Sequence, residues 1–375
     1  MKIVFLCGSL EPGRDGVGDF TRRLSGELIR QKHSVAAVAL NDMYVVNEIT
    51  SSQEVDGINL PVLRVPSVQP LKTRFERAKG WIKEFDPEWL SLQYVPFSFH
   101  SKGLPFGLSK LLSELGQGRR WHIMFHELWV GMNVESSKKY IWWGWLQKQL
   151  IKSLISGLKP NLIQTQTRLY QAQLSKLGFN SGFLPLFPNI PNFNKTKAIY
   201  VEKNTSFKDE ISFVIFGAIH PGAPIEEFAK DISQYAKNNG RKISLSLIGR
   251  CGEEQKNWTT IFRSVGVDVK LVGEQIPERI SELLGNASVG ISTTPIALAD
   301  KSSAIMVMRE HGLTVVCVSM PWQPRGVLNL EPLPGIIEYR KGNLELCLSG
   351  KSDLSIVNTL PEVSNLFIDS ISATV

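Results

Sequence analysis

Residues 2–20 read KIVFLCGSLEPGRDGVGDF, in which an apolar run leads through a glycine-rich loop into an amphipathic segment. A short apolar run bounded by turn residues is typical of a buried strand, and the pattern after the loop is typical of a helix. The stretch therefore predicts a strand, a turn and a helix, which is the first half of a unit with parallel strands.

The same alternation continues along the chain. In the first half, we expect strands over five β-rich runs, at 2–8, 34–40, 89–95, 121–127 and 161–166. Amphipathic segments lie between or after them, at 17–32, 71–85, 104–117, 137–158 and 167–178. Beyond residue 210 the alternation resumes, with strands expected at 211–217, 242–249, 268–273, 287–293 and 314–318. Strands that alternate with helices predict parallel sheets covered by helices on both faces.

A stretch rich in proline and asparagine separates the two alternating regions. Residues 184–210 hold three Pro and four Asn among mixed charges, which is typical of a linker. We therefore predict two Rossmann-like, doubly wound α/β domains facing a cleft, with ligands bound beyond the carboxyl ends of the strands. The expected parts are an N-terminal domain (1–187), a linker (188–210), a C-terminal domain (211–350) and a final segment (351–375) that packs back on the first domain.

The composition is that of an ordinary globular protein, since 43% of the 375 residues are hydrophobic and 21% are charged. No apolar run reaches the length of a membrane span, and the four Cys show no metal or redox spacing. The first apolar run lacks a credible cleavage site, so we expect a strand there and not a signal peptide. These features predict a cytoplasmic protein with reduced thiols.

Positive charge is concentrated in the first half of the chain. Residues 1–187 carry 23 Lys and Arg against 15 Asp and Glu, whereas the remainder carries 19 against 20. A basic half predicts an acidic partner, such as an anionic lipid surface or a phosphorylated substrate. No nucleic-acid-binding module is visible, so we expect no nucleic-acid partner.

One expected helix combines tryptophan with lysine. In KKYIWWGWLQKQLIKSLISGLK (138–159), a lysine pair precedes Trp142, Trp143 and Trp145. Basic residues with interfacial aromatics suit the surface of an anionic bilayer, which predicts weak peripheral contact with such a surface. The alternative is a core helix with solvated lysines, because apolar positions at helical spacing usually face a core.

The glycine-rich loop is a candidate for backbone contact with a ligand. Gly16 and Gly18 allow the amides of a helix start to approach a ligand, but their spacing is not the G-x-G-x-x-G of dinucleotide-binding domains. Arg14 is an exposed candidate for substrate contact. The alternative is a surface loop with Asp19 as the helix cap.

Polar side chains end two other expected strands of the first half. His126 and Glu127 end the run at 121–127, and Gln93 and Tyr94 end the neighbouring one. We expect all four at the cleft edge, where His126 is a candidate for acid–base chemistry. The alternatives are a His that is simply packed in the fold, and a Gln93 and Tyr94 that pack under the cleft wall.

The second half offers an anion site at a helix start. In ADKSSAIMVMREHG (299–312), Lys301, Ser302 and Ser303 stand where an amphipathic segment begins. Serine alone predicts an N-cap, whereas serine, lysine and the free amides of a helix start together suit a diphosphate. Gly217 and Arg250 follow other strands of this half, and Arg250 is a further candidate for a phosphate contact.

Taken in order, these stretches resemble the family-four glycosyltransferases of the GT-B fold. The resemblance rests on four stretches in the family's order: GRDGVGDFTRRLSGEL (13–28), HELW (126–129), LFPNIP (186–191), and STTP (292–295) followed by KSSAIMVMREHGLTVV (301–316). No single motif is specific, but the ordered set is, and it spans most of the chain. The resemblance implies two Rossmann-like domains, no metal or other cofactor, and transfer of a sugar from a nucleotide donor with retention at the anomeric carbon.

The resemblance also implies roles for individual residues. The donor would lie mainly on the second domain, where Thr294 and the segment from Lys301 match the family's donor site, and the acceptor on the first. Gly16 and Gly18 would lie near the diphosphate and the transferred sugar, with Asp19 orienting the acceptor or the loop. His126 matches the family's active-site His beside the sugar.

The chain departs from the family at charged positions. Ala299 and Val307 occupy the places of two Glu that usually bind the ribose and the transferred sugar. Ala218 stands where the family has an Arg for the diphosphate, and the Lys that usually follows is missing. We therefore expect Lys301 to supply a cation that the diphosphate site otherwise lacks.

The sequence thus predicts a glycosyltransferase that uses a nucleotide-sugar donor and an acceptor of unknown type, whether saccharide, lipid-linked or small molecule. The missing carboxylates motivate a second hypothesis, a non-catalytic protein of the same fold that binds a nucleotide or a phosphorylated ligand. A sugar-nucleotide epimerase is a third and less favoured hypothesis, because no close set of acidic and basic residues for proton abstraction is visible.

Overall fold

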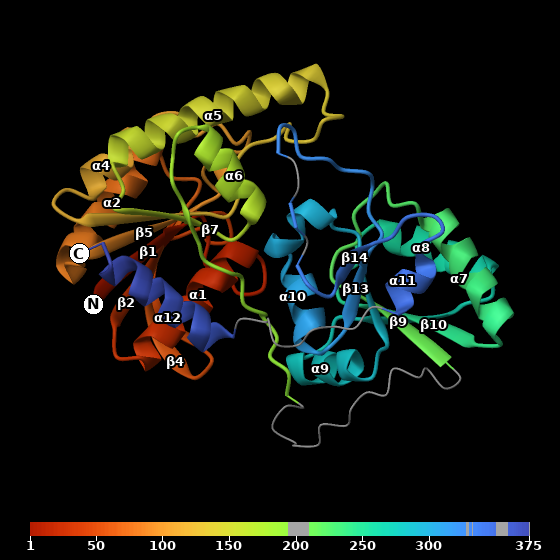
Figure 1. Ribbon diagram of the computed structural model, residues 1–375. Helices are drawn as coiled ribbons and strands as arrows, with labels where there is room; N and C mark the ends of the chain where they lie inside the picture. Colours follow the sequence, from red (N-terminus) through yellow and green to blue (C-terminus); the bar gives the residue numbers. More distant parts are fainter. Residues whose placement is uncertain (194–209, 328–329, 332, 350–358, 375) are drawn as a thin grey trace. The chain divides into compact units, whose positions relative to one another are not determined.

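The computed structural model describes residues 1–193, 210–327, 330–331, 333–349 and 359–374. The chain divides into two compact units, each with its own sheet (Figure 1). Unit 1 comprises Met1–Pro185, Pro324–Val327 and Thr359–Val375, and unit 2 comprises Leu186–Gln323 and Leu328–Asn358. Most of the linker expected at 188–210, and the first part of the final segment, lie outside the described residues.

Unit 1 is built on an eight-stranded sheet in the order β3-β4-β2-β1-β5-β6-β7-β8. Neighbouring strands are parallel, apart from the antiparallel hairpin of β3 and β4. Five strands coincide with the expected runs: β1 (Lys2–Cys7), β2 (Ser34–Asp42), β5 (Trp89–Tyr94), β6 (Arg120–Phe125) and β7 (Leu162–Thr165). Three were not predicted: β3 (Ile49–Val55), β4 (Ile58–Pro66) and β8 (Gly182–Phe183).

Helices cover both faces of this sheet (Figure 1). On one face, α4 (Leu108–Leu115) packs against both α2 (Leu71–Phe85) and α5 (Lys138–Leu158). On the other, α1 (Gly16–Arg30) lies beside α12 (Leu360–Ser372), and Gln31 Nε2 donates to Ser364 Oγ at 2.7 Å. The unit also contains α3 (Pro96–Phe99) and α6 (Arg168–Lys176).

Unit 2 is built on a six-stranded parallel sheet in the order β11-β10-β9-β12-β13-β14. Its strands are β9 (Glu210–Phe216), β10 (Lys242–Ile248), β11 (Asp268–Gly273), β12 (Val289–Ser292), β13 (Thr314–Cys317) and the unpredicted β14 (Ile336–Glu338). The strand order reverses between β9 and β12. In doubly wound sheets, ligands bind at such a reversal, beyond the carboxyl ends of the strands.

Two hydrophobic clusters hold helices to the two faces of the unit 2 sheet. One includes residues of α7 (Ile225–Asn239), α8 (Glu254–Ser264) and α11 (Leu344–Ser349). The other includes residues of α9 (Pro277–Gly285), the short 3₁₀ helix η1 (Ile296–Lys301) and α10 (Ser303–Glu310). Two mainly parallel sheets with helices on both faces confirm the predicted α/β fold class. Within the described ranges, no helix combines the length and the apolar character needed to cross a bilayer.

Candidate functional site

The start of α10 is the candidate site in unit 2. Ser302 is the N-cap, and its side chain accepts a hydrogen bond from the amide of Ile305 at 3.4 Å. Ser303 is the first helical residue and is exposed, whereas Lys301 ends η1 and is half-buried. The predicted cap is therefore confirmed. The first amides of a helix have no carbonyl partner within the helix and carry its positive end, so this helix start suits an anion.

Glycine brings the neighbouring loops close to this helix start. Gly217 follows β9 with φ of 85°, and a Cβ built on it would lie 3.7 Å from Ala304 Cβ in the first turn of α10. Gly249 follows β10 with φ of 87°, and its Cβ would lie 3.6 Å from the Gly217 nitrogen. Because side chains are strained at these angles, both positions favour glycine. The backbone thus approaches the α10 start without side chains in between.

One hydrogen bond joins the loops that follow β9 and β12, and a second one lies within the turn after β12. The amide of His220 donates to Thr293 Oγ1 at 2.7 Å, and the amide of Thr294 donates to Ser292 Oγ at 3.1 Å. His220 is exposed on the loop after β9. His220 was not predicted as a site residue, although it stands three positions after Gly217, in the loop where the family usually carries its diphosphate cations.

Arg250 is engaged with a carboxylate in the structure. Its guanidinium makes two hydrogen bonds to Glu274, at 2.8 and 2.9 Å, and both side chains are more than half exposed. A bidentate pair of this kind uses the donors that would otherwise meet a phosphate. Phosphate binding by Arg250 would therefore require the pair to open.

The two positions that lack the family's Glu are buried. Ala299 is 1% exposed and Val307 is fully buried, and both belong to the hydrophobic cluster around α9 and α10. Neither side chain faces an open site. Both positions are therefore part of the apolar core in this chain, and neither supplies a carboxylate to a ligand.

In unit 1, the glycine-rich loop is organised differently from the prediction. Asp15, and not Asp19, caps α1, and its side chain accepts from the amide of Val17 at 2.9 Å. Asp19 instead accepts from the amide of Gly13 and from Arg22, at 3.1 and 2.7 Å. A carboxylate one turn inside the helix can reach back to the loop, which is how Asp19 closes it.

The two glycines at the start of α1 have different roles. A Cβ on Gly18 would lie 2.6 Å from the carbonyl oxygen of Ser9, so Gly18 is needed for the close packing of α1 on β1. Gly16 is exposed, and nothing lies within 4 Å of a Cβ built on it. Arg14 is exposed beside it. Of the predicted loop contacts, Gly16 and Arg14 are thus accessible, whereas Gly18 is a packing residue.

A buried ion pair anchors this loop to the sheet. Arg64 lies 2.7 Å from Asp42, and it also pairs with Glu11 in the loop at 2.5 Å. Ser9 Oγ and the amide of Leu10 donate to the same Asp42 carboxylate, at 3.1 and 3.2 Å. Burial alone raises the pKa of Asp42, but these hydrogen bonds, led by that from Arg64, outweigh burial and hold the pKa below its ordinary value.

His126 lies inside unit 1 and not at an open edge. The residue is 3% exposed, its Nε2 lies 2.8 Å from Gln93 Oε1, and its Nδ1 lies 3.0 Å from Gln166 Oε1. The ring of Phe20, at the start of α1, packs against the His126 ring at 5.1 Å. The structure therefore brings the predicted residues His126 and Gln93 together, but it buries both, which corrects their expected placement.

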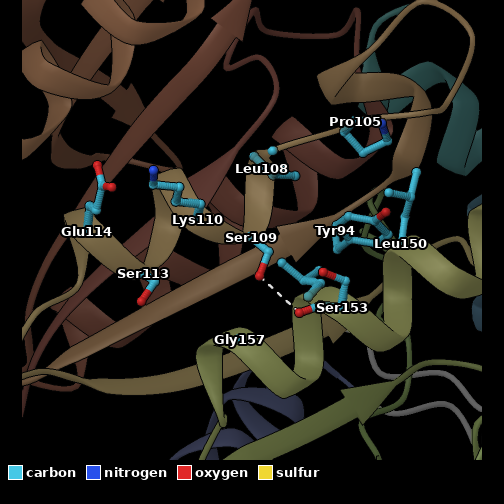
Figure 2. Close-up of a pocket in the computed structure, with 12 residues that line it drawn as sticks. Tyr94, Pro105, Leu108, Ser109, Lys110, Ser113, Glu114, Leu150, Ser153 and Gly157 are labelled. Atoms are coloured by element: carbon cyan, nitrogen blue, oxygen red, sulfur yellow. Dashed lines mark hydrogen bonds between the residues drawn. The ribbon is translucent and has the colours of Figure 1, made fainter.

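Tyr94 belongs to a different face of the sheet. Because neighbouring residues of a strand point to opposite faces, Gln93 points towards His126 and Tyr94 points towards α4 and α5. Tyr94 lines a cavity of about 450 Å³ between these two helices, beside Leu150, and Ser109 donates to the carbonyl of Ser153 at its edge (Figure 2). The expectation that Gln93 and Tyr94 share one wall is therefore wrong. Glu127 is half-buried directly after His126.

The described residues contain no cluster of His, Cys, Asp and Glu that is arranged to hold a metal ion. The four cysteines, which are Cys7, Cys251, Cys317 and Cys347, are free and buried. Burial raises the pKa of each thiol, so none is an activated nucleophile.

The structure resembles solved enzymes that handle nucleotide sugars. It matches Alr3699/HepE from Anabaena, solved in complex with UDP, over the whole of both chains (TM-score 0.60, 12% identity). The chain has the GT-B fold. A putative UDP-N-acetylglucosamine 2-epimerase from Listeria monocytogenes matches at a TM-score of 0.58 and 10% identity, with 99% of this chain and 96% of that chain covered.

A third match is WaaG, a glycosyltransferase involved in lipopolysaccharide biosynthesis, with a TM-score of 0.52, 11% identity, and coverage of 98% and 95% of the two chains. No protein-family model and no curated protein sequence matches the chain. The GT-B fold is therefore shared with glycosyltransferases and with sugar-nucleotide epimerases, and the fold alone does not choose between them.

Proposed function

We propose that this GT-B protein is a nucleotide-sugar-dependent glycosyltransferase whose donor diphosphate binds at the start of α10. The observation that carries the proposal is the geometry of that helix start. Ser302 caps it, Ser303 is exposed, Lys301 precedes it, and Gly217 brings the β9 loop within contact of its first turn. Solved structures of the same fold that contain UDP or UDP-glucose support a nucleotide ligand.

The proposed site explains how a departing diphosphate would be stabilised. Negative charge increases on the diphosphate as the bond to the sugar breaks. First-turn amides, the hydroxyl of Ser303 and the ammonium of Lys301 are groups that favour this charge. We propose transfer with retention and without a metal ion, on the basis of the family resemblance.

In this proposal unit 1 provides the acceptor side. Gly16 and Arg14 are its accessible loop residues, and Thr294 and the Gly217 loop belong to the donor side in unit 2. His126 is the proposed active-site histidine, and its hydrogen bonds to Gln93 and Gln166 hold its ring in place. Asp19 holds the glycine-rich loop closed by accepting from the amide of Gly13. The acceptor is a saccharide, a lipid-linked molecule or a small molecule.

Calorimetric titration with UDP, GDP and ADP, followed by incubation with the matching nucleotide sugars, tests this function. We expect saturable binding of one nucleoside diphosphate, and slow release of that diphosphate from its nucleotide sugar. Binding without any release of diphosphate would contradict the enzyme and support the non-catalytic alternative. The burial of Ala299 and Val307 where the family has two Glu is the observation that favours this alternative.

The same incubation distinguishes the epimerase. A 2-epimerase changes the sugar while it remains attached to the nucleotide, which the proton spectrum of the recovered nucleotide sugar reports. We expect the sugar of the recovered donor to be unchanged. An altered sugar would contradict the glycosyltransferase proposal.

We also propose that unit 1 contacts an anionic membrane surface through the first turns of α5. Trp142 is 65% exposed and Trp145 is 51% exposed, and with Ile141 and Lys138 they line one apolar groove. The core interpretation of this helix is therefore wrong for its first turns, although the later residues Ile151, Leu154, Ile155 and Leu158 are buried. Trp143 is held against the protein, since its indole N–H donates to the carbonyl of Lys102 at 2.9 Å.

The charge next to the tryptophans supports an anionic surface as the partner. Lys138 and Lys139 are exposed beside the tryptophans, and unit 1 contains most of the basic half of the chain. Each lysine near an anionic bilayer contributes about 1 kcal/mol, and tryptophan prefers the interface. This contact, with four free thiols that suit a reducing compartment, supports a cytoplasmic protein that attaches peripherally.

Co-sedimentation with vesicles of equal parts phosphatidylglycerol and phosphatidylcholine tests the membrane contact. We expect binding at low salt that is lost at high salt, because about 0.1 M salt screens charges beyond roughly 10 Å. The double variant Trp142→Ser, Trp145→Ser should not bind. Met43→Ser, Val46→Ser is the matched control, because these apolar residues of unit 1 are 70% and 83% exposed. Equal binding by both variants would contradict the assignment to α5.

A further inference from the structure

A chain of buried polar side chains runs through unit 1 from His126 towards the C-terminal helix. His126 Nε2 meets Gln93 Oε1 at 2.8 Å, and Gln93 Nε2 donates to Ser91 Oγ at 2.8 Å. Ser91 Oγ in turn meets His122 Nδ1 at 2.8 Å. These four residues are between 0 and 3% exposed. The chain therefore lies in the fold where water does not compete for its hydrogen bonds.

The far end of the chain lies on α12. Gln164, on β7, donates through Nε2 to Ser370 Oγ at 3.1 Å, and Ser370 donates to the carbonyl of Leu366 at 2.6 Å. The ring of Phe367 packs on His122 at 5.2 Å. The C-terminal helix thus covers His122 and supplies the last hydroxyl of the series.

Ser370 fixes which end of the Gln164 amide faces α12. A hydroxyl has one hydrogen, and Ser370 gives it to a backbone carbonyl, which can only accept. Gln164 must therefore offer its amide nitrogen to Ser370, which leaves Gln164 Oε1 as an acceptor. Within the described part of the chain, this oxygen and His122 Nε2 are both buried and make no hydrogen bond. They complement one another only when His122 Nε2 bears the hydrogen.

His122 passes this direction on because it is neutral. Burial, together with the neighbouring His126, lowers the pKa of His122 to about 3, against a smaller effect of Gln164. A neutral ring with its hydrogen on Nε2 has a bare Nδ1, which accepts the hydroxyl hydrogen of Ser91. Ser91 Oγ then accepts from Gln93, as the structure shows, and Gln93 presents only its oxygen to His126.

We infer that Ser91, His122 and the α12 residue Ser370 are positioning residues that hold the hydrogen of His126 on Nε2 and leave Nδ1 as the nitrogen that exchanges a proton. Nδ1 lies 3.0 Å from Gln166 Oε1, so a bare Nδ1 requires the Gln166 amide to turn its NH₂ group towards the ring. An amide can offer its oxygen to a protonated nitrogen or its NH₂ group to a bare one. His126 can therefore gain or lose a proton at Nδ1 while Nε2 keeps its partner.

The ring nitrogens of His126 report this arrangement directly. The experiment uses the full chain labelled with ¹⁵N in its six histidines, with the His126 signals assigned from their loss in His126→Gln. Long-range ¹H–¹⁵N spectra are recorded as the pH is raised until the ring is neutral. We expect one tautomer, with hydrogen on Nε2. Neutral His126 with its hydrogen on Nδ1 would overturn the inference, whether or not the protein transfers sugar.

Variants of the hydrogen-bonded residues test whether the direction of the hydrogen bonds, and not packing alone, sets the tautomer of His126. Ser91→Ala should split the neutral His126 signals between two tautomers, and Ser91→Thr, which keeps the hydroxyl, should restore the single form. Ser370→Ala should produce the same splitting from the far end. Ser372→Ala is the matched control, because Ser372 makes the same bond to its own helix, to the carbonyl of Ile368 at 2.7 Å, and is exposed. Unchanged His126 signals in both Ser91→Ala and Ser370→Ala would overturn the inference.

Discussion

At the carboxyl end of the unit 1 sheet, His126 and Gln93 bond to each other and are 3% and 1% exposed. At the carboxyl end of the unit 2 sheet, Ser303 is exposed at a helix start, and the Gly217 loop lies against the first turn of that helix. Both edges were expected to carry ligand contacts, because both follow parallel strands. The position of a residue along a strand therefore predicts at which edge of the sheet it lies. Whether the residue is accessible to a ligand depends on the side chains that pair with it.

The difference follows from which groups are used at each edge. In unit 1 the polar groups are side chains, and each can be satisfied by another side chain of the same sheet. In unit 2 the groups are the first amides of α10, which the helix itself cannot satisfy. We therefore expect substitutions at the unit 1 edge to change stability first, and substitutions at the α10 start to change ligand binding first.

The largest expected effect is on the buried ion pair of unit 1. Arg64→Met leaves the fully buried carboxylate of Asp42 without its cation and should lower the free energy of unfolding of unit 1 by about 3–5 kcal/mol. Urea unfolding followed by tryptophan fluorescence measures this unit, which contains seven of the nine Trp.

Arg23→Met is the matched control, because Arg23 pairs with the half-exposed Asp56 at 3.0 Å and such a pair contributes less than about 1 kcal/mol. An equal loss in both variants would show that the buried network is not special.

At the α10 start, Lys301→Ala should weaken nucleoside-diphosphate binding by about 1.5–3 kcal/mol, or roughly 10- to 150-fold in Kd. Uridine, which lacks the phosphates, should bind the variant as it binds the parent, if UDP is the diphosphate that binds. Calorimetric titration of both ligands measures the difference, with Lys270→Ala, an exposed lysine of β11, as the control. Equal weakening of nucleoside and diphosphate would exclude Lys301 as a diphosphate ligand.

The buried His122 gives unit 1 a pH dependence. Its pKa in the folded state is about 3, below the ordinary 6.5, so the unfolded chain binds the extra proton as the pH falls between these values. His122 leaves the free energy of unfolding unaffected above about pH 6.5 and lowers it as the pH falls further, by about 1.2 kcal/mol between pH 6 and pH 5. His122→Gln should remove this slope from urea unfolding curves, and an unchanged slope would contradict the burial argument.

The smallest effect concerns the helix cap in unit 2. Ser302→Ala removes the acceptor for the amide of Ile305 and should cost about 1 kcal/mol of stability. Ser303→Ala keeps the cap and should leave stability almost unchanged while it weakens diphosphate binding. Thermal unfolding and titration of the two variants separate the cap from the ligand contact. The opposite pattern would assign the cap to Ser303.

Much of the fold could be predicted, because parallel strands buried on both faces are continuous apolar runs. The hairpin of β3 and β4 escaped for the opposite reason: ITSSQEV (49–55) is mostly polar and exposed. Its turn at Asp56-Gly57, with positive φ at both residues, is nonetheless a strong hairpin signal in the sequence. The signal was present but lay outside the apolar pattern.

The candidate sites were predictable to a lesser degree. A serine N-cap follows from local chemistry; the sequence offered it as the alternative to an anion site, and the structure has it at Ser302. The separation of Gln93 from Tyr94 follows from strand alternation, but only when the strand and its two faces are known. The exposure of Trp142 could not be derived, because a tryptophan at helical spacing fits a core and a surface equally well.

Hydrogen–deuterium exchange with and without nucleotide tests the central claim, that a nucleoside diphosphate binds at the start of α10. We expect the bound diphosphate to slow exchange at the first two amides of α10, those of Ser303 and Ala304, whereas the corresponding nucleoside leaves them unchanged. Slowed exchange confined to other parts of the chain, or equal slowing by the nucleoside and its diphosphate, would contradict the account.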